Sequence, residues 1–357
     1  MKYPALLSFA ELLPTLEQFD AIIDVRSPSE FALDHIPGAI NCPVLDDEQR
    51  QRIGTMYKQV GAFEAKKIGA ALVAHNIAHH IETQFIDKPH AWKPLLYCWR
   101  GGNRSGAMAL ILARIGWPAI QLDGGYKEYR RHVNAELLTL PALFSFKVVC
   151  GPTGSGKSRL LQILAEHGAQ VLDLEKLAAH RGSVLGSLPT EAQPSQKKFE
   201  SDIWHTLRSF DPARVVYIES ESKKVGNLRV PDALIDNMRS SACIDLQLAH
   251  EDRVKLLMQD YEHFISDPDL LNAQLACLVQ LHGKEKIAHW QALASTHEME
   301  KLVGELLEDH YDPAYSKSID RNFVHVKDAQ KICLSDISEV AFAHAASQII
   351  ATASPSS

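Results

Sequence analysis

At 357 residues and 46% hydrophobic composition, the chain can form two packed domains, and it lacks the ~20-residue apolar run of a membrane-spanning helix. Its net charge of −7 argues against a dedicated nucleic-acid-binding protein, because phosphate contacts normally require a basic surface. The six scattered cysteines show no paired spacing for disulfides or zinc, which favours a cytoplasmic protein.

Residues 1–136 are predicted to form an α/β domain in which strands alternate with helices. Apolar runs predict strands at residues 21–25, 95–98 and 119–122, and this alternation is typical of a parallel sheet. A short linker, residues 137–145, follows this domain.

A cysteine-containing loop follows the second of these strands and leads into a helix-like stretch. Its residues are Cys98, Trp99, Arg100, Gly101, Gly102, Asn103, Arg104 and Ser105. Backbone N–H groups at a helix start, together with nearby arginines, stabilise a thiolate and bind anions. We therefore predict Cys98 as the catalytic nucleophile and residues 99–105 as an anion cradle. A packed core cysteine would not explain the glycines and arginines that follow it.

Three segments around this loop resemble the rhodanese family. They are DVRSPSEF at 24–31, HIPGAIN at 35–41 and LDGGY at 122–126. The resemblance implies that Cys98 carries sulfur or selenium as a persulfide or selenosulfide. Five residues separate Cys98 from Arg104, whereas sulfurtransferases of that family usually have four. The longer loop belongs to phosphatase-like members, so the donor at Cys98 is expected to carry a phosphate.

A second anion cradle is predicted in an α/β domain at residues 146–250. A buried strand ends at Cys150, and the next eight residues fit the phosphate-loop (P-loop) pattern G-x-x-x-x-G-K-[ST] before a helix begins. Backbone N–H groups of this loop can wrap a diphosphate, and the serine hydroxyl can ligate Mg²⁺. The predicted diphosphate-binding residues are Gly151, Thr153, Gly154, Ser155, Gly156, Lys157 and Ser158, with Ser158 as a possible Mg²⁺ ligand.

Further strands are expected at 171–174, 215–219 and 243–248. The strand at 215–219 ends in glutamate, where an ATPase typically has aspartate, so ATP hydrolysis is not assumed. The polar residues predicted as partners of the P-loop are Asp173, Arg181, Glu219, Glu221, Lys223 and Lys224.

Residues 251–357 are predicted to be mostly helical and packed on the P-loop domain. Apolar residues recur at helical spacing from Val254 to Phe264 and again from Leu271 to Leu281, which predicts buried stripes. A late strand is expected near 323–326. Residues 310–313 either close over the P-loop or form a turn, and the pattern does not distinguish the two.

Two more segments, DLEKLAAHRGS at 173–183 and ESESKKVG at 219–226, resemble the tRNA 2-selenouridine synthase family. The resemblance implies replacement of sulfur by selenium in 2-thiouridine at the wobble position of tRNA. It also implies selenophosphate as donor and an S-geranyl intermediate made from geranyl diphosphate. Selenophosphate suits the Cys98 loop, and geranyl diphosphate suits the P-loop. Of the basic residues, Arg181, Lys223 and Lys224 are the favoured tRNA contacts.

Other interpretations remain open at this point. A rhodanese-fold phosphatase or sulfurtransferase would also use Cys98, coupled to a nucleotide-binding P-loop domain, and a nucleotide-regulated binding protein would use the fold only as a scaffold. Cys42 is either a resolving thiol for Cys98 or a small packed residue, and the second reading is favoured.

Overall fold

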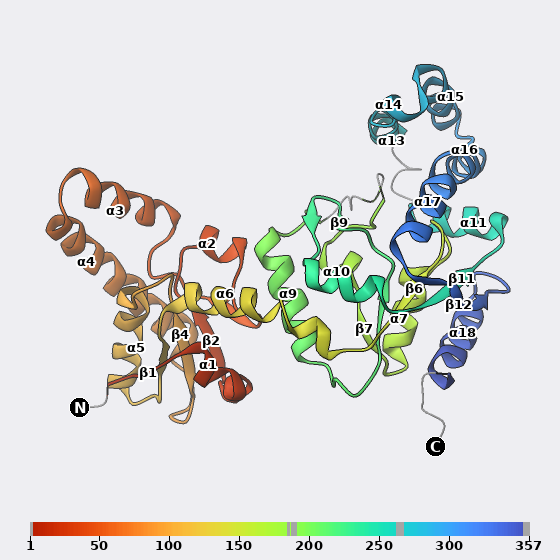
Figure 1. Cartoon of the computed structure of the whole chain (residues 1–357). Helices are drawn as coiled ribbons and strands as arrows, with labels where there is room; N and C mark the ends of the chain where they lie inside the picture. Colours follow the sequence, from red (N-terminus) through yellow and green to blue (C-terminus); the bar gives the residue numbers. More distant parts are fainter. Residues whose placement is uncertain (1–2, 184–185, 187–190, 262–267, 353–357) are drawn as a thin grey trace. The chain divides into compact units, whose positions relative to one another are not determined.

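The computed structural model describes residues 3–183, 186, 191–261 and 268–352 (Figure 1). The chain divides into two compact units. Unit 1 comprises Met1–Glu136 and Ser195–His205, and unit 2 comprises Leu137–Pro194 and Thr206–Ser357. Within the described residues, no helix is both long and apolar enough to cross a membrane.

Unit 1 contains a sheet of five parallel strands in the order β1-β5-β4-β2-β3. The predicted strands at 21–25, 95–98 and 119–122 are confirmed as β2, β4 and β5. Strand β4 is central, and all four of its residues are buried. The strand bounds are β1 Ala5–Leu7, β2 Ala21–Asp24, β3 Ala39–Asn41, β4 Pro94–Tyr97 and β5 Ile120–Leu122.

The helices of unit 1 pack on this sheet or follow its strands. Helix α5 buries Met108, Ala109 and Leu112 in a core shared with Ile23 of β2 and Leu96 of β4. The helix bounds are α1 Phe9–Leu12, η1 Leu13–Gln18, α2 Pro28–Leu33, α3 Asp47–Gln59, α4 Ala62–His80, η2 Ile81–Phe85, α5 Asn103–Ile115 and α6 Gly125–Glu136.

One helix of unit 1 comes from a distant part of the sequence. Most of α9 (Gln196–Arg208) belongs to unit 1, although the predicted boundaries assigned it to the P-loop domain. Its Trp204 is 2% exposed, packs edge-on against Tyr129 and donates a hydrogen bond from Nε1 to Glu136 at 2.7 Å. Arg130 of α6 forms an ion pair with Glu200. Burial of an aromatic face, together with this ion pair, ties α9 to α6.

Unit 2 contains a second sheet of five parallel strands in the order β12-β11-β6-β8-β7. The predicted late strand exists, but it begins at His325 and continues to Cys333, where it pairs with β11. The C-terminal part therefore adds a strand to the sheet as well as helices. The bounds are β6 Phe146–Cys150, β7 Gln170–Leu172, β8 Val216–Glu219, β9 Lys224–Val225, β10 Leu228–Arg229, β11 Ala242–Gln247 and β12 His325–Cys333.

The helices of unit 2 include the predicted C-terminal set. Helix α18 joins the core of the P-loop sheet, where Phe342 and Ala346 pack with Leu161 and Leu164 of α7. Leu281 was expected in a buried stripe but is 70% exposed, and Phe264 lies outside the described residues. The bounds are η3 Leu140–Leu143, α7 Lys157–Glu166, α8 Leu174–Leu177, α10 Asp232–Arg239, α11 His250–Asp260, α13 Pro268–Ala276, α14 Val279–His282, α15 Lys284–Ser295, α16 Met299–Leu306, η4 Leu307–Tyr311, α17 Asp312–Asn322 and α18 Glu339–Ala351.

Candidate functional site

Cys98 lies directly after the central strand β4, at the edge of the sheet where parallel α/β proteins bind ligands. It is 2% exposed. The Ser105 hydroxyl donates a hydrogen bond to Sγ at 3.4 Å, and the thiol reaches the Arg100 carbonyl at 4.0 Å. The sulfur thus lies inside the loop with a hydroxyl beside it, a placement suited to a cysteine nucleophile.

The backbone of the Cys98 loop is held by the start of α6. The Tyr126 and Lys127 N–H groups donate to the carbonyls of Cys98 and Trp99 at 2.8 and 3.1 Å. Gly125 makes this approach possible, because a Cβ there would lie 2.3 Å from the Cys98 carbonyl oxygen. The sequence showed a family resemblance at 122–126 but did not show that Gly125 and Tyr126 support the loop.

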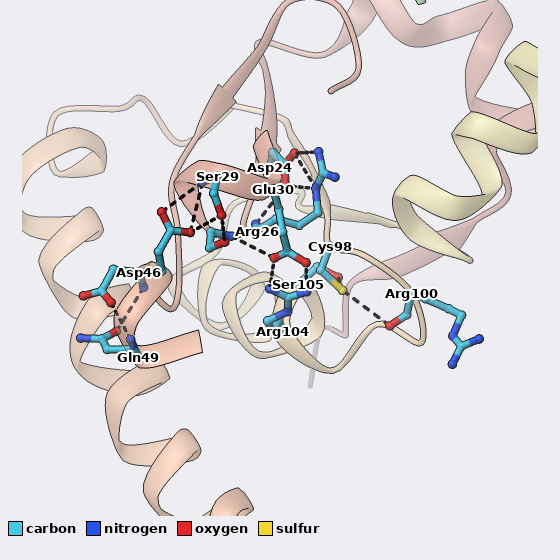
Figure 2. A network of polar contacts seen from close by, with 12 residues as sticks. Asp24, Arg26, Ser29, Glu30, Asp46, Gln49, Cys98, Arg100, Arg104 and Ser105 are labelled. Carbon is cyan, nitrogen blue, oxygen red and sulfur yellow. Dashed lines mark hydrogen bonds and ion pairs between the residues drawn. The ribbon is translucent and has the colours of Figure 1, made fainter. Parts of the chain in front are cut away.

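The two loop arginines differ from the prediction. Figure 2 shows the Arg100 side chain pointing away from Cys98, and Arg100 is exposed. Only its carbonyl contacts the sulfur, so the prediction that the Arg100 guanidinium lies beside the thiolate is wrong. Arg104 donates instead to Glu30, with Nη1 to Oε2 at 2.8 Å and Nη2 to Oε1 at 3.4 Å (Figure 2).

Glu30 is a site residue that sequence reasoning missed. Its side chain and that of Arg104 are only 19% and 16% exposed. Burial by itself raises the pKa of Glu30, but the hydrogen bond and charge of Arg104 outweigh burial and lower it. Glu30 therefore remains charged at neutral pH, and its two contacts with Arg104 fix the direction of the Arg104 guanidinium.

A buried polar network supports this side of the sheet. Arg26 pairs with Asp24 at 2.6 Å, and its guanidinium lies 4.1 Å from the centre of the Tyr126 ring. The Tyr126 hydroxyl donates to Asp34 at 2.8 Å, and the Tyr126 ring stacks with that of Trp99. The motif residues at 24–26 thus connect β2 to the helix that holds the Cys98 loop.

The second cradle connects β6 to α7, as predicted. Lys157 Nζ donates to the Gly151 carbonyl at 2.7 Å, and the Ser158 hydroxyl donates to Glu175 Oε2 at 2.6 Å. Gly154 and Gly156 have φ angles of 79° and 87°, which glycine adopts without strain. Among the described residues, the buried Ser155 hydroxyl has no hydrogen-bond partner. The Ser155 hydroxyl is therefore available to hydrogen-bond a ligand.

Carboxylates gather beside this loop. The Glu175 N–H donates to Glu219 Oε1 at 2.8 Å. Burial, followed by repulsion from Asp173, raises the pKa of Glu219 well above its ordinary value. Burial, followed by repulsion from Glu175, raises the pKa of Glu221 to about 7, while Lys157 opposes the rise. The predicted partners Asp173, Glu219 and Glu221 thus lie close enough to repel one another, as does Glu175, without forming a set of metal ligands among the residues that the structure describes.

The predicted basic partners are placed differently. Arg181 pairs with Asp260 at 3.3 Å, and its guanidinium lies 5.1 Å from the centre of the Tyr261 ring. Lys223 and Lys224 are exposed beside the β9–β10 hairpin. Within the described part of the chain, no three His, Cys, Asp or Glu side chains are grouped to hold a metal ion, so Mg²⁺ at Ser158 stays a prediction.

The C-terminal helices hold the P-loop through residues that the sequence did not single out. Arg253 of α11 donates to the Thr153 carbonyl at 2.7 and 3.0 Å and pairs with Asp312 at 2.6 Å. The Tyr315 hydroxyl of α17 accepts from the Gly151 N–H at 2.6 Å. Residues 310–313 are helical, so the turn interpretation is wrong, and Asp312 reaches the P-loop through Arg253.

Cys42 is fully buried, and its thiol donates to Gln84 Oε1 at 3.5 Å. Burial raises the pKa of Cys42 to about 12. These observations support the reading of Cys42 as a packed residue, because a thiol with so high a pKa is a poor nucleophile at neutral pH.

The raised pKa of Glu221 predicts a pH-dependent stability. In the folded chain the pKa of Glu221 is about 7, above its ordinary value of 4.5, so charging it costs stability as pH rises through this window. Glu221→Gln is expected to raise Tm by a few degrees at pH 8 and to change it little at pH 4.5. Thermal melts at both pH values test this. Glu300→Gln, at an exposed position, is the control, and an equal effect of Glu221→Gln at both pH values would contradict the assignment.

A cysteine loop at the end of one parallel sheet and a P-loop at the end of another define a two-domain α/β protein that joins a rhodanese-like domain to a P-loop domain. The rhodanese-like domain family matches residues 8–132, and the family described as tRNA 2-selenouridine synthase AAA domain matches residues 144–269. The chain belongs to the tRNA 2-selenouridine synthase family.

Relatives named tRNA 2-selenouridine synthase support this membership. The chain is 31% identical to one from Alcanivorax borkumensis over 84% of this chain and 90% of the relative. It is 33% identical to one from Sulfurovum sp. over 84% of this chain and 89% of the relative. It is 35% identical to one from Nitrosomonas europaea, where the match spans 67% of this chain and 63% of the relative.

Proposed function

We propose that the chain converts 2-thiouridine at the wobble position of tRNA to 2-selenouridine through an S-geranyl intermediate. The observation that carries this proposal is the presence of two different cradles, Cys98–Ser105 and Gly151–Ser158, on one chain of this family. The name of the relatives points to tRNA and 2-selenouridine. Geranyl diphosphate and selenophosphate are the donors that we propose for the two cradles.

In the first step, the sulfur of 2-thiouridine attacks the first carbon of geranyl diphosphate. A C–S bond forms, the C–O bond breaks, diphosphate leaves, and the alkylated base loses its N3 proton to solvent. The P-loop N–H groups and Lys157 stabilise the negative charge of the departing diphosphate. Ser158 and Glu175 present oxygens 2.6 Å apart, the ligand type that Mg²⁺ prefers. When bound, Mg²⁺ would neutralise part of the diphosphate charge.

In the second step, selenophosphate binds with its phosphate on the Cys98 loop. We propose this route in place of the selenosulfide on Cys98 that the resemblance implies, because selenophosphate holds selenium at the selenide level and a selenosulfide would need a two-electron oxidant. The Cys98 thiolate attacks phosphorus, so an S–P bond forms, the Se–P bond breaks and hydroselenide is released. Hydroselenide attacks C2 of the S-geranyl base, the C–S bond breaks with its electron pair on sulfur, and the geranyl thiolate leaves and takes the proton from selenium. Water then hydrolyses the phosphocysteine. The Ser105 hydroxyl, which donates to Sγ at 3.4 Å, holds the sulfur in place for this attack.

The tRNA contacts that we propose are the basic side chains of Arg181, Lys223 and Lys224. Lys223 and Lys224 are exposed, and exposed lysines can pair with phosphates of the RNA backbone. The local positive charge would offset the acidic balance of the whole chain.

Arg104→Lys is expected to lower kcat/KM for selenophosphate roughly 10- to 100-fold, because a point charge cannot grip Glu30 and a phosphate as a planar guanidinium does. Steady-state kinetics with S-geranyl tRNA measure the effect. Arg100→Lys is the matched control, since its side chain points away from Cys98 (Figure 2). Wild-type kinetics of Arg104→Lys would mean that Arg104 does not hold the donor.

Mass spectrometry of tRNA nucleosides from a deletion strain tests the overall function. Loss of 2-selenouridine with retention of 2-thiouridine is the expected result, and complementation with the gene should restore 2-selenouridine. Unchanged nucleosides in the deletion strain would refute the proposal and favour a phosphatase that uses Cys98.

A further inference from the structure

Unit 2 contains an apolar hollow beside the P-loop. Its cavity volume is about 60 Å³ and it opens to solvent, so it covers part of a chain that enters it. Eight of its eleven lining residues are leucine, methionine or valine, contributed by α11, α13, α16 and the η4 segment. Part of the helical stripe that the sequence predicts as packed core, including Leu257, Met258 and Leu271, thus lines a cavity.

The hollow lies directly beside the first half of the P-loop. Thr153 of the P-loop is itself a lining residue, and its carbonyl is held by Arg253. Gly154 packs directly on the wall, since a Cβ at Gly154 would lie 2.9 Å from Leu257 Cδ1. An anion cradle and an apolar cavity therefore share one backbone segment.

This arrangement discriminates between classes of ligand. A nucleotide base needs hydrogen-bonding partners in its pocket, because burying its polar edge without them is costly. Most of the wall side chains are aliphatic, and burial of a hydrocarbon chain against them is favourable. A ligand that suits both features carries a diphosphate at one end and an alkyl or alkenyl chain at the other.

We propose that this hollow, lined by Leu257, Met258, Leu302, Val303 and Leu306 among others, holds the hydrocarbon chain of a prenyl diphosphate whose diphosphate lies on the P-loop. The inference rests on the proposed function, which requires such a donor, and adds the site of its chain. The reacting carbon then lies at the boundary between the hollow and the loop, where a tRNA sulfur can approach it without uncovering the rest of the chain.

Binding measurements on the full chain test the inference. Calorimetry with inorganic diphosphate and with geranyl diphosphate gives the preference due to the hydrocarbon chain. Burial of part of the ten-carbon chain, less the cost of ordering it, should make geranyl diphosphate bind about 100-fold tighter in the wild type.

Val303→Trp is designed to fill the hollow, since Val303 is a half-buried wall residue. It should reduce the preference for geranyl diphosphate to less than about tenfold and leave the affinity for inorganic diphosphate within about twofold. Leu281→Trp is the matched control, because Leu281 is 70% exposed in the same group of helices and does not line the hollow. It should keep the wild-type preference.

A second variant tests the inference independently in case Val303→Trp does not fold. Met258→Ala enlarges the hollow and should shift the preference toward the longer farnesyl diphosphate by about tenfold. If both Val303→Trp and Met258→Ala keep the wild-type preference for geranyl diphosphate, the hydrocarbon chain does not bind in this hollow. That result would leave geranyl diphosphate as the proposed donor. Equal affinity of the wild type for inorganic and geranyl diphosphate would overturn both this inference and the proposed donor.

Discussion

Replacement of Cys98 by serine is expected to lower the rate of selenium transfer to S-geranyl tRNA by at least about 10³-fold. The change removes the nucleophilic sulfur that Ser105 contacts, while it alters the side-chain volume little. The affinity for tRNA should stay within about twofold of wild type. Single-turnover assays with selenophosphate and S-geranyl tRNA measure the rate, and filter binding measures the affinity.

Cys42→Ser is the matched control for this experiment. Cys42 is a buried cysteine of the same domain, with its thiol on Gln84, and its serine variant should retain selenium transfer. Near-wild-type selenation by the Cys98→Ser variant would exclude Cys98 as the nucleophile. Equal loss in the two variants would instead point to a general defect in folding or to a second thiol in the reaction.

Lys157→Ala is expected to lower the rate of geranylation about 10²-fold or more, which corresponds to about 3 kcal/mol of lost stabilisation of the departing diphosphate. Selenation that starts from 2-thiouridine should fail with it. Selenation of supplied S-geranyl tRNA should survive, because the Cys98 loop is untouched. Chromatography of tRNA nucleosides after incubation with each pair of substrates separates these outcomes.

The two variants therefore make opposite predictions for one intermediate. Cys98→Ser should accumulate S-geranyl tRNA, and Lys157→Ala should not form it. Arg159→Lys, which keeps the positive charge one residue beyond the P-loop motif, serves as a control in the same helix. Normal geranylation by Lys157→Ala, or protection of Lys157 from chemical labelling by ATP and not by geranyl diphosphate, would assign the P-loop to another ligand.

The sequence by itself determined the features that depend only on neighbouring residues in the chain. Cys98 follows a buried apolar run, and Gly151–Ser158 joins a strand to a helix, so both cradles and their flanking elements could be predicted. The strands β2, β4, β6 and β8 were found for the same reason. Short apolar runs bounded by turn residues carry a local signal that does not depend on distant contacts.

Only the tertiary structure decided what surrounds each cradle. Glu30 is 74 residues from Arg104, and Tyr315 is 164 residues from Gly151. Such pairs leave no periodicity in the chain, because they depend on how strands are ordered and helices packed. The same limit applies to the Ser195–His205 segment, whose amphipathic pattern shows that it buries one face but not which unit it covers.

The apolar hollow shows this limit most directly. Helical spacing correctly indicated that Leu257, Met258 and Leu271 lie on inward-facing stripes. An inward face can pack against other side chains or line a cavity, and the two have the same periodicity. The choice depends on the distance and angle between α11, α13 and α16, which tertiary packing sets and local sequence does not encode.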